Sequence, residues 1–158
     1  MAANKKPRKA YRQRYAHHGS SLNTIRLCQR YTADEVRNQS IVGWDSFAKM
    51  VNGTADAEDV EAMYSLAHIV YFRSSFEDKK HFAPAVDLGK RAVDASTRTR
   101  NRYRETGRAG FDGEAMKTMR ECLEFMDELL AESKIGLMMC ALMLVEDMRK
   151  REAESCTT

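Results

Sequence analysis

An apolar repeat with helical spacing in the C-terminal third constrains this chain most. Intervals of three and four residues separate Met116, Met119, Leu123, Met126 and Leu130, which places them on one face of an α-helix. After the tripeptide 132–134, similar intervals separate Ile135, Met138, Leu142 and Val145. Two such seams joined by a short turn predict a C-terminal antiparallel helical hairpin.

Helix-start and helix-stop signals extend this pattern upstream. The spacing of Thr32 and Glu35 is that of a capping box, and Asn52-Gly53 supplies a left-handed stop. Thr54-Ala55-Asp56 begins another helix with the same chemistry, and Asp112 can cap the helix that follows the glycine-rich loop 107–113. No segment shows the alternation of a strand. We therefore predict an all-α fold, a bundle of four to five helices.

Composition and length fit a single globular domain. The chain has 158 residues, 43% of them hydrophobic and 31% charged, and only 2 are proline. Its longest uncharged apolar run, 135–145, is far shorter than the roughly 20 residues that a membrane span needs. We expect the bundle domain to cover 20–152 and a frayed tail to follow at 153–158.

Charge is distributed unevenly along the chain. The formal net charge is +3, yet residues 1–30 carry 8 basic and no acidic residues, whereas residues 109–158 carry 6 basic and 11 acidic ones. A short segment of like charges that buries little cannot form a core. We predict that residues 1–19 form a disordered basic arm attached to the helical domain.

Two basic groups are candidates for binding phosphates. Lysine and arginine release counterions from nucleic acid, and the arm also holds Tyr11 and Tyr15, whose rings can stack on unpaired bases. A second group lies along one stripe of a predicted helix, and the earlier positions of that stripe carry no acidic residue. The candidate nucleic-acid ligands are Lys5, Lys6, Arg8, Lys9, Arg12 and Arg14 in the arm, and Arg100, Arg104 and Arg108 in the domain.

Two other features support alternative functions. The carboxylates of Asp127, Glu128 and Glu132 crowd the end of one predicted helix, and such a surface could dock a basic groove. The alternative is then a protein–protein inhibitor of a host complex. The run 135–145 is apolar on all sides of its helix and needs burial all round. It is either a central helix or the interface of a homo-oligomeric structural protein.

Signals for catalysis, metals and cofactors are lacking. The chain has no glycine-rich phosphate loop, zinc-protease motif or serine elbow. Arg12 and His17 have a spacing used by helical ribonucleases, but they lie in the arm, where nothing positions them. The four cysteines contain no C-x-x-C pair, which is typical of reduced cytoplasmic thiols. We expect no enzyme activity, metal, cofactor or secretion signal.

Three segments resemble a group of small uncharacterised proteins from bacterial phage and plasmid regions. Residues 5–12, Lys-Lys-Pro-Arg-Lys-Ala-Tyr-Arg, look like the start of these proteins, and residues 102–107 and 113–115 are similar to their C-terminal half. The resemblance implies a bacterial cytoplasm and a mobile-element accessory role, often one of binding host complexes. It carries over no catalytic residue. The leading hypothesis is a non-enzymatic protein that binds nucleic acid or a nucleoprotein complex.

Overall fold

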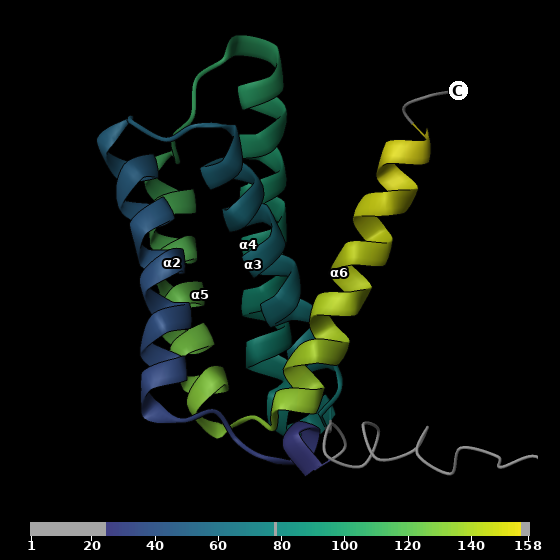
Figure 1. Cartoon of the computed structure of the whole chain (residues 1–158). Helices are drawn as coiled ribbons and strands as arrows, with labels where there is room; N and C mark the ends of the chain where they lie inside the picture. Colours follow the sequence, from purple (N-terminus) through teal and green to yellow (C-terminus); the bar gives the residue numbers. More distant parts are fainter. Residues whose placement is uncertain (1–24, 78, 156–158) are drawn as a thin grey trace, which may run out of the picture.

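The chain is mainly helical in the part that the computed structural model describes, residues 25–77 and 79–155. The long helices there are α2 (Ala33–Asn52), α3 (Ala57–Ser75), α4 (Lys79–Thr106), α5 (Gly113–Glu132) and α6 (Ile135–Ser155) (Figure 1). An isolated bridge pairs Arg30 with Lys134, and these two ranges contain no β-strand. The all-α prediction is confirmed. The predicted arm, residues 1–19, lies outside the described residues.

Capping side chains fix where the helices begin and end. Thr32 and Glu35 form the predicted capping box of α2, and Gly53 ends that helix with φ of 71°. Asp56 caps α3 and forms a second capping box with Asp59. Asp112 caps α5 by accepting a hydrogen bond from the backbone of Ala115. These local signals are confirmed. They could be predicted from the sequence because each depends only on residues three or four positions apart.

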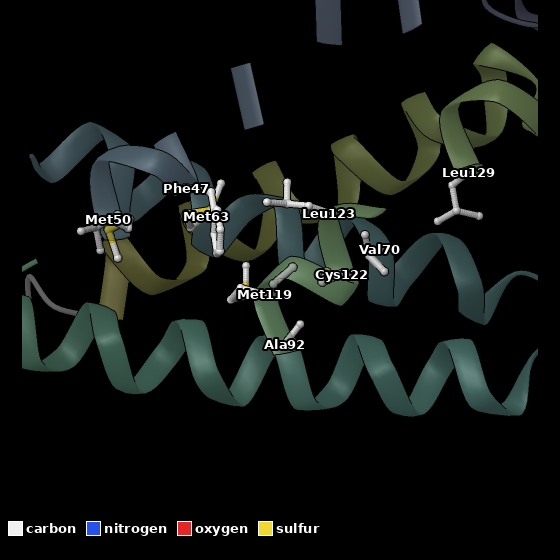
Figure 2. Packing of buried hydrophobic residues seen from close by; sticks show 11 residues of the cluster. Phe47, Met50, Met63, Val70, Ala92, Met119, Cys122, Leu123 and Leu129 are labelled. Carbon is white, nitrogen blue, oxygen red and sulfur yellow. The ribbon is translucent and has the colours of Figure 1, made fainter. Parts of the chain in front are cut away.

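Helix α3 occupies the centre of the arrangement. It packs against α2, α4, α5 and α6, and its contact with α4 is the most extensive. The main cluster of buried side chains joins α2, α3, α4 and α5 (Figure 2). Its labelled members are Phe47, Met50, Met63, Val70, Ala92, Met119, Cys122, Leu123 and Leu129. Methionines from three helices thus fill the core, a role that their flexible side chains suit.

Helix α6 is placed differently from the rest. It packs mainly against α3, whereas α5 packs against α2, α3 and α4, and Figure 1 shows α6 slanting away from α5 beyond the turn that joins them. The turn itself is anchored elsewhere. Arg73 Nε on α3 donates to Ser133 Oγ at 3.0 Å, and the Ile135 amide donates to the Gln29 carbonyl at 2.9 Å. The predicted antiparallel hairpin of α5 and α6 is therefore not confirmed.

Within the described ranges, none of the helices has both the length and the apolar character needed to cross a bilayer.

Candidate functional site

Basic side chains from α4 and α6 meet around a hollow beside α3. The hollow has a volume of about 710 Å³. Its lining includes two acidic side chains, Glu61 and Glu152, and four basic ones, Arg100, Arg104, Arg149 and Lys150. Because four cations surround two carboxylates, the lining carries a formal excess of positive charge.

The guanidinium of Arg100 is the centre of a partly buried ionic network. Its Nε donates to Glu61 Oε1 at 2.5 Å and its Nη1 donates to Glu152 Oε2 at 2.7 Å. The guanidinium carbon lies 4.1 Å from the centroid of the Tyr64 ring, and the Tyr64 hydroxyl donates to Glu152 Oε1 at 2.6 Å. One side chain of α4 thereby links α3 to α6, through a cation–π contact as well as hydrogen bonds.

The protonation states of the network follow from burial and these partners. Burial raises the pKa of Tyr64 to about 12, and its hydrogen bond to Glu152 adds to the rise. Burial alone would raise the pKa of Glu152 as well, but hydrogen bonds from Arg100 and Tyr64 hold it below its usual value. Burial lowers the pKa of the neighbouring His68. At neutral pH the network is therefore an ion pair beside a neutral phenol and a neutral imidazole.

The other basic residues of the hollow remain largely exposed. Arg104 reaches Glu61 only at 3.7 Å and is 55% exposed. Arg149 Nη2 lies 3.2 Å from Glu61 Oε2, and its Nη1 donates to Ser65 Oγ at 3.3 Å. Lys150 is 72% exposed and its ammonium lies 4.0 Å from Asp147. These three cations, unlike Arg100, can reach a ligand without breaking a buried contact.

The structure brings Arg100 and Arg104 to the same hollow and leaves Arg108 outside its lining. Arg104 lies at the hollow, Arg108 is exposed in the loop beyond the end of α4, and Arg100 is buried. An open phosphate-binding role does not fit Arg100, because the residue is buried and its Nε and Nη1 groups already donate to Glu61 and Glu152. The stripe of α4 that holds these arginines carries no acidic residue of its own. Their acidic partners come instead from α3 and α6. The arm ligands Lys5, Lys6, Arg8, Lys9, Arg12 and Arg14 lie outside the described residues.

Sequence reasoning missed Arg149 and Lys150 as members of this site. The signal was the basic run 149–151 near the end of α6, but nothing in the sequence places that run beside α4.

The acidic candidates do not form one surface. Asp127 is half-buried and accepts hydrogen bonds from Ser40 Oγ at 2.5 Å and Trp44 Nε1 at 2.9 Å, so it joins α5 to α2. Glu128 and Glu132 are exposed and line a separate hollow that does not include Asp127. A docking role is thus open to Glu128 and Glu132, whereas the contacts of Asp127 give it a part in holding the bundle together.

Comparisons with protein-family models, curated proteins and solved structures found no match to the chain. Among the described residues, no group of three or more His, Cys, Asp or Glu side chains could hold a metal ion. The fold and the site define an all-α protein with a basic hollow built around one buried arginine.

Proposed function

We propose that this is a non-enzymatic protein that binds nucleic acid or a host nucleoprotein complex, as a cytoplasmic accessory of phage or mobile-element type. The observation that carries the proposal is the basic hollow. Its two carboxylates are engaged by Arg100, and three further cations line the same hollow. Phosphate groups are the anions that such a set of exposed guanidinium and ammonium groups binds well.

The N-terminal segment adds to this electrostatic attraction. Residues 1–24 contain six basic residues and no acidic one. A backbone that carries many phosphates can contact the hollow and this segment together, whereas a single small anion can contact only one of them. Two separate groups of basic residues on one chain raise the overall affinity for a long polyanion. The kind of ligand that fits is therefore a nucleic-acid strand, free or within a complex.

Binding of the full chain to a labelled single strand, measured by fluorescence anisotropy over a range of salt, tests the proposal. The double variant Arg104→Gln and Lys150→Gln is expected to bind about tenfold more weakly. The slope of log affinity against log salt should fall by roughly 1.4, because each lost phosphate contact on a single strand contributes about 0.7.

A matched control removes two exposed cations elsewhere. Lys117 and Arg120 lie on α5 and do not line the hollow, so Lys117→Gln with Arg120→Gln makes the same change in net charge. Equal weakening by both pairs would show that only net charge matters and would refute the hollow as the site. If the protein binds neither single-stranded nor double-stranded nucleic acid, the result favours the rival hypothesis. In that hypothesis the protein is an inhibitor that docks on a host protein through Glu128 and Glu132.

A further inference from the structure

A second hollow lies at the end of the bundle where α5 ends and α6 begins (Figure 1). Its volume is about 370 Å³, which is in the range of sites that hold a ligand group. It is called here the acidic hollow, because three carboxylates and two guanidinium groups give its lining a formal charge of −1. The charged lining consists of Glu77, Glu128, Glu132, Arg30 and Arg73, and the apolar lining of Phe82, Phe125 and Leu129.

Arg73, near the end of α3, lines this hollow as a buried cation with one unused donor. Its side chain is only 6% exposed. Its Nε donates to Ser133 Oγ at 3.0 Å and its Nη2 lies 2.8 Å from Glu77 Oε1, so two contacts fix the guanidinium in place. The third nitrogen, Nη1, is buried and has no hydrogen-bond partner among the described residues. Because a buried donor without an acceptor is costly and rare, this nitrogen points to a ligand that supplies the acceptor.

Glu128 and Glu132 are the second half of the site. They lie one turn apart at the end of α5 and are exposed, and no ion pair or hydrogen bond joins either of them to another described residue. Like charges at this spacing repel each other, and at the C-terminal end of a helix they also meet the negative end of its dipole. The last turn of α5 contains no basic residue that would offset this. A ligand cation between the two carboxylates would relieve both effects.

We propose that the acidic hollow binds a basic segment of a partner protein. A backbone carbonyl of that segment accepts from Arg73 Nη1, and a lysine or arginine side chain pairs with Glu128 and Glu132. A lining of net charge −1 fits a ligand that is cationic overall and brings a neutral acceptor, as a basic residue within a peptide does. The carboxylates would repel an anion, and a free amino acid, whose charges cancel, would leave the lining negative. The apolar lining can contact the aliphatic stem of the basic side chain.

The acidic hollow and the basic hollow share no lining residue. A nucleoprotein complex would therefore present its phosphates to one and a basic segment of its protein part to the other. The inference thus adds a protein contact to the proposed function, and the two are measured with different probes.

Fluorescence polarisation of a labelled peptide of alternating lysine and glycine, titrated with the full chain, tests the site. The double variant Glu128→Gln and Glu132→Gln should bind this peptide about tenfold more weakly, because two partly exposed ion pairs are lost. Its melting temperature should not fall, since both side chains are exposed. Its affinity for the labelled single strand should not fall either, so loss of peptide binding alone leaves the proposed function standing.

Glu114→Gln with Glu124→Gln is the matched control. Both residues are exposed on α5 and lie outside the acidic hollow, so the control makes the same change in net charge. It should bind the peptide as the wild type does. Equal weakening by the two double variants would overturn the proposal, and so would a wild type that does not bind the peptide.

Spermine tests the contact with Arg73, because it carries several cations but no carbonyl group. It should displace the labelled peptide about tenfold less effectively than the unlabelled peptide does, since it cannot accept from Nη1. Equal displacement would refute the role of Arg73.

A last variant distinguishes a partner protein from the basic N-terminal segment of this chain. Arg8→Gln with Arg12→Gln should leave the affinity for the peptide nearly unchanged. A large rise would show that the chain's own segment competes for the hollow, and would overturn the assignment to a partner.

Discussion

Arg100 holds three helices together through one guanidinium. It is buried, and burial alone would lower its pKa, but hydrogen bonds to Glu61 and Glu152 raise the pKa above its ordinary value. The pair stabilises the fold only while both sides are present, since one buried charge without its partner is costly. The residue is thus structural first, and it shapes the hollow by fixing the two carboxylates.

Arg100→Met tests this role, because methionine keeps much of the apolar stem and removes the charge. The free energy of unfolding should fall by about 2 kcal/mol, as expected for lost hydrogen bonds between charged groups that are partly exposed. Urea denaturation monitored by circular dichroism measures the change. Arg104→Met is the control and should cost less than about 0.5 kcal/mol, since its single ion pair is long and exposed. Equal losses would contradict the assignment.

At the scale of the element, the contact between α3 and α4 depends on one glycine. Gly89 is buried on α4, and a Cβ atom there would lie 2.7 Å from the Cα of Tyr71 and 3.0 Å from its Cβ. Backbone atoms cannot move aside as a flexible side chain would. The absence of a side chain at position 89 therefore lets the two helices approach closely.

Gly89→Ala should destabilise the protein although alanine favours helix. In an open helix position the change would gain about 1 kcal/mol, but here the helices must separate, and overpacking costs typically about 1–3 kcal/mol. We expect a lower melting temperature by differential scanning calorimetry. Gly113→Ala, where a Cβ would meet nothing within 4 Å, should be neutral or stabilising. A Gly89→Ala variant that is as stable as Gly113→Ala would show that the helices are not held this closely.

The helices themselves could be predicted from the sequence, whereas their partners could not. Caps at Thr32, Asp56 and Asp112 depend on residues nearby in the chain, so local spacing is sufficient. The seams of α5 and α6 share the same three–four spacing, and that spacing does not say which helix each one faces. The choice depends on contacts such as Arg73 with Ser133, 60 residues apart.

The same reasoning applies to the candidate site. Arg100 lies 39 residues from Glu61 and 52 from Glu152, and Asp127 lies 87 residues from Ser40. On their own helices these charged residues look unpaired, and only the packing of distant helices supplies their partners. Charge patterns along one helix can therefore suggest a ligand where the fold supplies an ion pair or a hydrogen bond.

For the whole molecule, the shifted pKa values predict that the folded chain loses stability both at acid pH and at alkaline pH. On the acid side, the pKa of His68 is lowered by burial, while hydrogen bonds overcome the effect of burial and lower the pKa of Asp59 and Glu152. Each of these groups binds protons more readily when the chain is unfolded. Stability should therefore fall as the pH drops below about 6.5, the ordinary pKa of histidine, and fall further as the carboxylates protonate.

On the alkaline side, burial raises the pKa of Cys122 from 9.0 to about 12 and that of Tyr64 from 10.0 to about 12. Both groups keep their protons longer in the folded chain. Their contribution is complete below the unfolded pKa and is lost as the pH rises towards the folded one. Together the two sides predict a plateau of maximum stability from about pH 6.5 to about pH 9.

Urea midpoints measured from pH 4 to pH 12 test this profile. The variant Tyr64→Phe isolates the contribution that ionisation of Tyr64 makes to it. The variant loses a hydrogen bond to Glu152, so its plateau should lie lower, by about 1 kcal/mol. Between pH 10 and pH 12, however, its stability should decline less steeply than that of the wild type, because phenylalanine does not ionise. The difference in decline should be on the order of 2 kcal/mol. Parallel declines in the two proteins would mean that Tyr64 ionises as freely in the folded chain as in the unfolded one, which its buried contact with Arg100 and Glu152 does not allow.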